Sequence, residues 1–325
     1  MLRIDNFSLQ LTGSDGRILP VLEQVSLRVA KGSCLGIAGE SGSGKSVLAM
    51  SIAGLMPIGY IHARSGVIDF VGCMILSASE AELRRLRGRK VGFVFQEPMT
   101  AMNPLMTLYD QIVETIYAHF PATSRADADS RVMLALDRAG FNEQQKFLHS
   151  YPHQLSGGMR QRAMIAMALV LEPELIIADE PTTAIDAALQ VQLLSGLRRQ
   201  IEHDHRSMIF ISHDLGVIRA VSDQLAVFYA GCLIESGDTR RILEAPAHPY
   251  TADLVSALPR LVEARKLPVS IAGALPAPDK KPAGCVYSDR CRYAQNICRD
   301  KRPTLQELSS SWQVSCYFPL HKGQV

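Results

Sequence analysis

The stretch CLGIAGESGSGKSVLAM, residues 34–50, decides the fold that this sequence predicts. The apolar run from Cys34 to Ala38 has the character of a buried strand, and the run after Ser46 has a helical character. The loop between them matches G-x-x-x-x-G-K-[ST], in which backbone N–H groups surround phosphate oxygens at a helix N-terminus. An ordinary Gly/Ser-rich turn is the alternative, but it would not require the Lys and Ser that end the pattern. The predicted nucleotide-binding residues are Gly39, Glu40, Ser41, Gly42, Ser43, Gly44, Lys45 and Ser46.

The chemistry of a phosphate loop requires a cation, a metal ligand and an acid. The Lys45 ammonium is expected to reach the β- and γ-phosphates, and the Ser46 hydroxyl to ligate Mg²⁺. The segment LIIADE places Asp179 and Glu180 directly after an apolar strand, at the edge where parallel sheets bind ligands. An acidic strand end is often merely solvated, but the phosphate loop favours a catalytic interpretation. Asp179 is therefore predicted to hold Mg²⁺, directly or through water, and Glu180 to polarise the attacking water.

Short β-branched runs alternate with longer helical patterns along the chain, which predicts an α/β fold with a largely parallel sheet. Between Gln96 and Leu155 the pattern predicts an inserted helical subdomain, and after about Asp238 the composition becomes Pro-rich and loop-like. The expected strands are Cys34–Ala38, Val91–Phe95, Leu175–Ala178, Met208–Ser212 and Leu225–Tyr229.

The composition fits a folded globular protein, since 47% of the 325 residues are hydrophobic and 20% are charged. A net charge of +2 without a long Lys/Arg tract argues against a nucleic-acid partner. The short basic cluster from Arg84 to Lys90 is expected to be a solvated helix face. No apolar run of about 18 residues occurs, and MLRIDNFSLQLTG lacks the regions of a signal peptide. We therefore expect a cytosolic chain whose membrane link would come from partners.

LSGGM, residues 155–159, together with RQRAMIAMALV and LIIADEPTTAID, resembles the signature and Walker B regions of ABC ATPases. The resemblance covers roughly residues 2 to 320. It implies a P-loop NTPase of the RecA-like type, an ABC cassette with an inserted helical subdomain. It also implies that Ser156, Gly157 and Gly158 grip the γ-phosphate held by a partner subunit, so that two cassettes close head to tail over two ATP molecules. Without the other motifs, SGG would be an ordinary helix cap.

Three more positions match the pattern of this family: Gln96 in FVFQEP, Asp186 in TTAID and His213 in IFISHD. The resemblance implies that Gln96 senses the γ-phosphate and Mg²⁺ and passes that state to the helical subdomain, which contacts membrane subunits. It implies that His213 contacts the γ-phosphate and helps to fix Glu180 and the attacking water. Gln96, Glu180 and His213 are thus the expected catalytic residues, and Asp186 joins the nucleotide-site residues.

Three residues depart from the family's pattern. Met159 stands where Gln is usual and Ile185 where Leu is usual, and both changes keep the phosphate-binding atoms. Leu11 lies where many relatives place an aromatic residue that stacks on adenine. This third departure predicts looser nucleotide affinity or base selectivity.

Seven cysteines occur, and four of them lie in the tail with the spacing C-x5-C-x6-C-x17-C: Cys285, Cys291, Cys298 and Cys316. Four thiolates suit an iron–sulfur cluster or zinc, and the lack of close C-x(2–4)-C pairs disfavours zinc. The tail, with HPYT at 248–251, also resembles the C-terminal extension of oligopeptide, dipeptide and nickel transporter ATPases. That resemblance implies a [4Fe–4S] cluster, with Zn²⁺ or unliganded thiols as the alternatives. The other three cysteines, Cys34, Cys73 and Cys232, are expected to be buried thiols.

Within that family, IIADEPTTAID looks more like the D-type ATPase of a pair, which implies a heterodimer with an F-type ABC ATPase. The resemblance also implies two transmembrane permease subunits, an extracytoplasmic solute-binding protein, and a peripheral place on the cytoplasmic face of the inner membrane. The chain would couple ATP hydrolysis to uptake of peptides, nickel or another small solute. The expected domains are a nucleotide-binding domain at 1–240, with its helical subdomain at about 97–165, and a four-Cys extension at 241–325.

Two other classes of function fit this sequence less well. A soluble ABC ATPase of DNA repair or translation would carry a long coiled-coil insert or two cassettes, whereas this chain has one cassette and a short insert. A P-loop kinase would need an acceptor-binding site and leaves LSGGM unexplained. The transport interpretation is therefore preferred.

Overall fold

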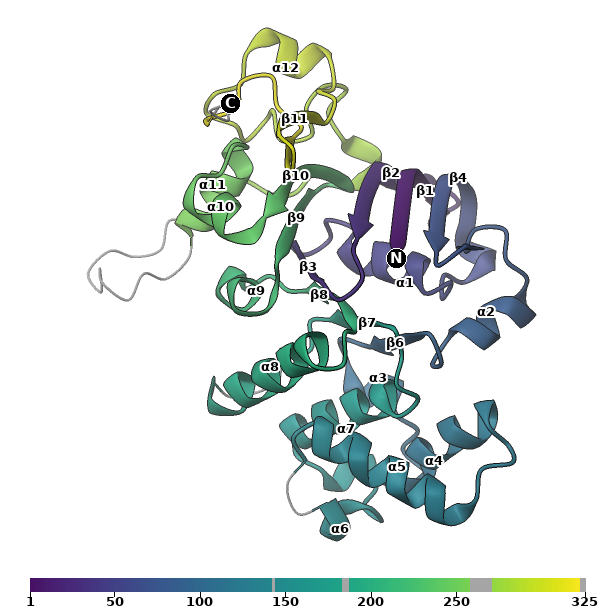
Figure 1. Cartoon of the computed structure of the whole chain (residues 1–325). Helices are drawn as coiled ribbons and strands as arrows, with labels where there is room; N and C mark the ends of the chain where they lie inside the picture. Colours follow the sequence, from purple (N-terminus) through teal and green to yellow (C-terminus); the bar gives the residue numbers. More distant parts are fainter. Residues whose placement is uncertain (142–143, 183–186, 258–270, 322–325) are drawn as a thin grey trace. The chain divides into compact units, whose positions relative to one another are not determined.

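The computed structural model describes residues 1–141, 144–182, 187–257 and 271–321. The chain divides into two compact units (Figure 1). Unit 1 combines Met1–Val29, Leu35–Leu76 and Ser212–Val325, and unit 2 combines Ala30–Cys34 with Ser77–Ile211. Unit 1 thus holds the phosphate loop and the tail, while unit 2 holds the helical region, the LSGGM segment and the strand before Glu180.

Unit 1 contains an antiparallel sheet in the order β2-β1-β4-β5. Leu2, Ile4 and Leu9 of β1 are at most 1% exposed, because one face of the sheet packs on the core. These strands were not expected from the sequence, since register shifts on both sides of Phe7 break the two-residue alternation. The strands are β1 Leu2–Thr12, β2 Ile18–Val29, β4 Ile61–Phe70 and β5 Cys73–Met74.

A second group of strands in unit 1 has the order β11-β12-β10-β9-β3, in which β3 and β9 are parallel and the other pairs antiparallel. These strands are β3 Cys34–Ala38, β9 Gln224–Tyr229, β10 Cys232–Asp238, β11 Gln306–Ser309 and β12 Trp312–Val314. The helices are α1 Lys45–Ile52, η1 Ile58–Tyr60, α9 Leu215–Val221, α10 Thr239–Glu244, α11 Pro249–Ser256, η3 Pro278–Lys280 and α12 Asn296–Asp300.

Unit 2 combines a parallel group of strands in the order β8-β7-β6 with a set of helices. Every residue of β7 and β8 is buried, as is usual for parallel strands. The strands are β6 Val91–Val94, β7 Leu175–Asp179 and β8 Ser207–Ile211. The helices are α2 Glu80–Leu86, α3 Pro98–Ala101, α4 Leu108–His119, α5 Arg125–Arg138, α6 Gln144–Phe147, η2 Pro152–Gln154, α7 Gly157–Leu169 and α8 Ala187–Glu202.

The expected α/β fold is confirmed, and each of the five expected strands is found to within one residue at either end. The helical character between Gln96 and Leu155 is also confirmed by α3 to α6. Among the helices of the described ranges, none is both long enough and apolar enough to cross a bilayer.

The expectation of a loop-like tail is wrong. The segment after Asp238 forms α10, α11, α12, β11 and β12. In α11 the HPYT motif starts the helix: the Nδ1 atom of His248 accepts a hydrogen bond from the N–H of Tyr250, 3.0 Å away. Pro249 occupies the first helical turn, where its missing N–H costs no hydrogen bond. Proline here marks a helix start and was misread as a loop signal.

Two smaller expectations also need correction. Helix α2 ends at Leu86, so only part of the basic cluster lies on a helix. Arg87 is the residue that follows the helix, and its guanidinium forms an ion pair of 2.7 Å with Glu80 in the first turn. Cys34 and Cys232 are buried as expected, but Cys73 is partly exposed because it lies on the two-residue edge strand β5.

A buried carboxylate holds the tail to strand β10. Glu235 is fully buried and accepts three hydrogen bonds, from the N–H of Ala247 (2.8 Å), the N–H of His248 (2.9 Å) and the indole N–H of Trp312 (2.9 Å). Burial raises the pKa of Glu235, and the hydrogen bonds lower it in part. The carboxylate therefore joins the start of α11 and strand β12 to the sheet.

Glu235→Ala should lower the free energy of unfolding by about 3 kcal/mol, because three buried donors lose their acceptor. Urea denaturation followed by the fluorescence of Trp312, the only tryptophan in the chain, would measure the change in unit 1. Glu307→Ala, at an exposed position of β11, is the matched control and should change the midpoint little. Equal midpoints for the two variants would contradict the proposed role of Glu235.

Candidate nucleotide-binding and four-cysteine sites

The phosphate loop joins the C-terminal end of β3 to the start of α1. Gly39 has a φ of 151°, and a Cβ at this position would lie 2.2 Å from the carbonyl oxygen of Phe228. Gly44 has a φ of 97° and caps the N-terminus of α1. Only glycine tolerates such a close approach and such backbone angles without strain. The sequence pattern of this loop is therefore required by its conformation.

Lys45 lies inside this loop and is only 5% exposed. Its Nζ atom donates to the carbonyl oxygens of Gly39 (2.7 Å) and Glu40 (2.9 Å). Ser41 and Gly42 at the tip of the loop are exposed to solvent. A cation enclosed by a loop at a helix N-terminus is the arrangement that binds phosphate.

In unit 2 the structure brings Gln96 and Glu180 together. The side-chain amide of Gln96 donates to Oε2 of Glu180, 3.5 Å away. Glu180 adopts a φ of 46°, which is uncommon for a residue other than glycine, and its N–H donates to the carbonyl oxygen of Ile211 (3.0 Å). Asp179, the residue before it, ends β7 and is 5% exposed. The strained backbone fixes the direction in which the Glu180 carboxylate leaves the strand.

The LSGGM segment forms the N-terminus of α7. The hydroxyl oxygen of Ser156 accepts from the N–H of Met159 (3.3 Å), which caps the helix, and Gly157 and Gly158 form its first turn. Ser156 and Gly157 are exposed. Because residue 159 contributes its backbone N–H to this cap, Met in place of Gln preserves the cap.

The remaining residues that the sequence analysis singled out for the nucleotide site are His213, Asp186 and Leu11. His213 is exposed and follows β8, and it belongs to unit 1 together with the phosphate loop, whereas Gln96, Asp179 and Glu180 belong to unit 2. Asp186, like Ile185, falls outside the described residues. Leu11 is half-buried near the end of β1.

The four tail cysteines line one pocket in unit 1, as the sequence grouping suggested. Burial raises the pKa of Cys285 to about 11 and of Cys316 to about 12. Three of the sulfur atoms accept a hydrogen bond from the backbone two residues later: Cys285 from Tyr287, Cys291 from Tyr293 and Cys316 from Phe318. Such N–H to sulfur bonds stabilise thiolates and are an outer-shell feature of metal–thiolate sites.

Two buried donors face the same pocket. His248 and Ser288 line it, and within the described residues neither Nε2 of His248 nor Oγ of Ser288 has a hydrogen-bond partner. Burial lowers the pKa of His248 to about 3, so its ring is neutral. Because Nδ1 accepts a hydrogen bond, Nε2 carries the proton. Unsatisfied buried donors are rare in folded proteins and call for an acceptor in the pocket.

The cysteine side chains are nevertheless not arranged as a finished metal centre. In the part of the chain that the structure describes, no group of three or more His, Cys, Asp or Glu residues has metal-binding geometry. The shared pocket, the N–H to sulfur bonds and the two donors fit a sulfur-rich group, whereas the thiols themselves must move and lose their protons to bind it.

Sequence reasoning missed two tail residues that contact the phosphate loop. Arg290 pairs with the carboxylate of Glu40, and Tyr250 accepts a hydrogen bond from the N–H of Glu40. Arg290 and Glu40 are 250 positions apart, so no local pattern links them. The sequence signals were the HPYT motif, which contains Tyr250, and the arginine directly before Cys291, but neither indicated a contact with the loop.

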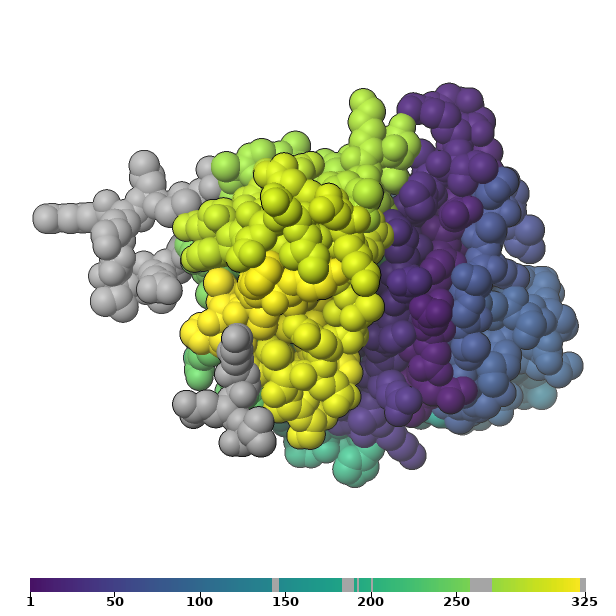
Figure 2. All heavy atoms as spheres, turned by 90° about the horizontal axis from the view of Figure 1, so that it is seen from above, coloured from purple at the N-terminus to yellow at the C-terminus, as the bar shows by residue number. Residues whose placement is uncertain are grey.

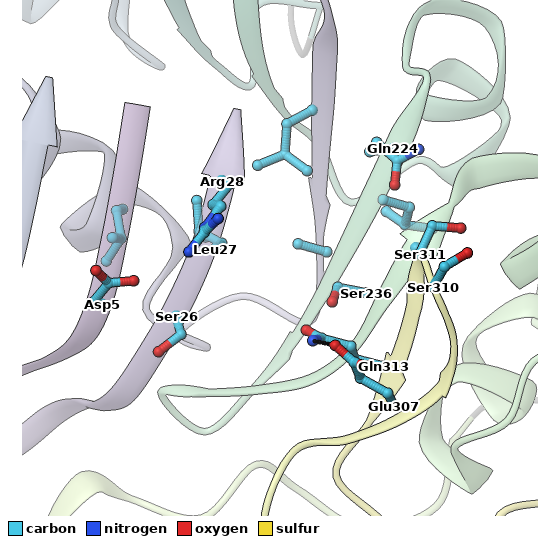
Figure 3. A pocket seen from close by; sticks show the side chains of 15 residues that line it. Asp5, Ser26, Leu27, Arg28, Gln224, Ser236, Glu307, Ser310, Ser311 and Gln313 are labelled. Carbon is cyan, nitrogen blue, oxygen red and sulfur yellow. Dashed lines mark hydrogen bonds between the residues drawn. The ribbon is translucent and has the colours of Figure 1, made fainter. Parts of the chain in front are cut away.

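A separate hollow in unit 1, of about 490 Å³, lies between strands of the two sheets (Figure 3). Asp5 and Arg28 lie on its β1–β2 side, and Gln224, Glu307 and Gln313 come from β9, β11 and β12. None of the described phosphate-loop residues lines it. It is therefore distinct from the loop that would hold phosphate.

Comparison with known proteins matches both the phosphate-loop region and the tail to families of ABC transporter proteins. A family model described as ABC transporter matches residues 22–183, and one described as oligopeptide/dipeptide transporter, C-terminal region, matches residues 234–298. The chain is 37% identical over 321 residues to the dipeptide transport ATP-binding protein DppD of Escherichia coli, covering 98% of this chain and 97% of the relative. It is 39% identical over 320 residues to the probable D,D-dipeptide transport ATP-binding protein DdpD of the same organism, with the same coverage.

Solved structures agree with the fold. The ATP-binding cassette MJ0796, in a dimeric post-hydrolysis state bound to ADP and Pi, is 27% identical and has a TM-score of 0.67, covering 74% of this chain and 99% of that one. CbiO1 from Clostridium perfringens, part of the ABC transporter complex CbiONQ, is 25% identical with a TM-score of 0.62, covering 75% and 90%.

Proposed function

This chain belongs to the ATP-binding subunits of dipeptide and oligopeptide ABC transporters, and we propose that it drives peptide uptake through two permease subunits at the cytoplasmic face of the inner membrane. It is an ABC-type ATPase, as its cassette fold and its relatives show. The observation that carries the transport proposal is the presence of the phosphate loop and the four-cysteine tail in one chain. An extracytoplasmic solute-binding protein would deliver the peptide.

Nucleotide binding begins at the phosphate loop. The Lys45 ammonium exchanges its bonds to the neutral carbonyls of Gly39 and Glu40 for bonds to the β- and γ-phosphates, because an anionic acceptor attracts the ammonium more strongly. Ser46, Asp179 and Gln96 are the residues that would hold Mg²⁺, which would offset the negative charge of the phosphates. The loop N–H groups, from Gly39 to Ser46, surround the phosphate oxygens.

Hydrolysis uses Glu180 as the base that polarises water, with His213 contacting the γ-phosphate and fixing the water. The bond between Gln96 and Glu180 supports this role, because it links the proposed base to the residue that senses the γ-phosphate. Gln96 also directly precedes the helical subdomain at about 97–165, which we propose as the contact region for the permeases. Loss of the γ-phosphate would thus alter the position of Gln96 and, through the helical subdomain, the contact with the membrane subunits.

Two cassettes are needed for a complete site. Ser156, Gly157 and Gly158 present a helix N-terminus that suits the γ-phosphate held by a second ABC ATPase, and Asp186 belongs to the same interface. We assign the second ATPase to the F-type, so that the pair is a heterodimer. Residues 1–240 form the nucleotide-binding domain and 241–325 the extension in this proposal.

The four tail cysteines are proposed to hold a [4Fe–4S] cluster, with Zn²⁺ as the alternative ligand. Cys285, Cys291, Cys298 and Cys316 would supply the thiolates, and His248 and Ser288 would donate hydrogen bonds to sulfur. When bound, such a cluster cross-links the segments that carry the cysteines and is able to exchange an electron.

Glu180→Gln should leave ATP affinity close to that of the wild type but lower the hydrolysis rate by at least about 10²-fold, because the water loses its base. Steady-state hydrolysis by the assembled transporter and equilibrium binding of a fluorescent ATP analogue would measure the two effects. Glu174→Gln, an exposed position just before β7, is the control and should hydrolyse ATP normally. Normal turnover by Glu180→Gln would remove Glu180 from the mechanism.

Anaerobically purified chain should contain about four iron atoms and four acid-labile sulfides, and Cys298→Ser should lose most of both. Cys73→Ser is the matched control, because Cys73 lies on an edge strand and does not line the four-cysteine pocket, and it should retain the iron. Elemental analysis and visible absorbance provide the readout. A content of one zinc ion and no iron per chain would show that the four cysteines hold Zn²⁺ and not a cluster.

Affinity purification of the tagged chain from detergent-solubilised membranes should recover two polytopic membrane proteins and a second ABC ATPase, identified by mass spectrometry. Chemical cross-linking before solubilisation guards against loss of partners in detergent. If the cross-linked chain is recovered without membrane proteins, the soluble ABC ATPase becomes the better assignment.

A further inference from the structure

The guanidinium of Arg290 binds the phosphate loop directly. Its Nη1 atom donates to both carboxylate oxygens of Glu40, at 2.9 and 3.1 Å, and to the hydroxyl of Tyr229 at 3.1 Å. The Arg290 side chain is 7% exposed and that of Glu40 is 27% exposed. This ion pair is thus largely withdrawn from water, which strengthens the attraction and makes the loss of either partner costly.

The same arginine holds a second segment beside the loop. Its Nε atom donates to the carbonyl of Ala272 (2.8 Å) and its Nη2 atom to that of Ile271 (3.3 Å). The side chain of Leu275, a few residues on, lies 3.5 Å from the position that a Cβ on Gly42 would occupy. One side chain therefore fixes the start of the phosphate loop and the segment that lies against its tip.

The backbone of Glu40 is held by the tail as well. Its N–H donates to the hydroxyl of Tyr250, 2.9 Å away. The Tyr250 ring is fully buried and packs edge-on against the rings of Tyr229 and Tyr287, with centroids 4.7 and 5.2 Å apart. Three buried rings thus give the hydroxyl a fixed position, so that both the side chain and the main chain of Glu40 are restrained.

The negative charge of Glu40 makes its ion pair with Arg290 relevant to nucleotide binding. Glu40 is the only acid in a loop whose proposed ligand carries several negative charges. Paired with Arg290, its carboxylate is neutralised and turned toward the tail. Without Arg290 the carboxylate would be free to repel the phosphates, and the loop would lose its anchor.

We propose that the tail sets the nucleotide affinity of the phosphate loop by holding Glu40, with Arg290 and Tyr250 as positioning residues. The inference rests on the proposed ATPase function and deepens it. If the wild-type chain does not bind ATP, the function fails; if it binds and the variants below bind equally well, only this inference fails.

Arg290→Ala should raise the dissociation constant of a fluorescent ATP analogue and the KM for ATP about tenfold, with kcat nearly unchanged. Arg290→Lys should recover part of the affinity, since one ammonium cannot serve both Glu40 and the carbonyls of 271 and 272. Arg292→Ala is the matched control: Arg292 lies two residues after Arg290 but pairs with Asp253, so the variant should bind ATP normally. A KM for Arg290→Ala equal to that of the wild type would overturn the proposal.

A double-mutant cycle shows whether Arg290 acts through Glu40. In an E40Q background, Arg290→Ala should weaken ATP binding by less than about twofold, because no unpaired carboxylate remains. An equal loss in both backgrounds would show that Arg290 acts elsewhere.

Should Arg290→Ala not fold, Tyr250→Phe keeps the proposal testable. It retains the ring packing and removes only the acceptor of the Glu40 N–H, and it should raise the KM for ATP about threefold. Thermal melting and the metal content of each variant, compared with the wild type, identify a general loss of structure. A Tyr250→Phe variant with wild-type ATP affinity would count against the proposal.

Discussion

The close packing of the phosphate loop on the end of β9 is the constraint on which unit 1 depends. The loop passes so near Phe228 that only glycine fits at position 39, and beyond the strand the N–H of Gly231 donates to the carbonyl of Ser43 (3.0 Å). The same turn leads into β10, which carries Glu235 and, through it, the start of α11. The loop and the tail are therefore supported by one strand pair, and this is why Glu40 meets a residue 250 positions away.

The tail is attached by charged and polar contacts as well as by apolar packing. Lys281 donates to the carboxylate of Glu23 (2.7 Å) and to the carbonyl of Pro20 (2.5 Å), and Arg302 also pairs with Glu23. Figure 2 shows the C-terminal residues beside the N-terminal strands that carry these partners. Buried or half-buried ion pairs add little net stability compared with apolar packing, but they require one geometry. They fix the register of the tail on β2, and with it the direction from which Arg290 approaches the loop.

The parts that the sequence predicted are those encoded by neighbouring residues. The phosphate loop, the strand before Asp179 and the cap at Ser156 each arise from local spacing, and the structure contains all three. Features made by distant residues or by irregular backbone were not predicted: the bulged strand β1, the positive φ of Glu180 and the pairing of Arg290 with Glu40. The tail was misread for a related reason, since the same Pro that marks a loop also suits the first turn of a helix.

The turn between the first two tail cysteines links the four-cysteine pocket to the nucleotide loop. The N–H groups of Arg290 and Cys291 both donate to the carbonyl of Tyr287 (3.1 and 3.0 Å), and the N–H of Ser288 donates to that of Cys285 (2.9 Å). These short-range bonds make residues 285–291 one compact turn, in which the cysteines face the pocket while Arg290 reaches Glu40. Any group that draws the thiolates together restrains the backbone on both sides of Arg290. Arg290 is thus held in a compact turn between two of the pocket's cysteines, and its ion pair with Glu40 forms at a smaller entropic cost than it would from an unrestrained segment.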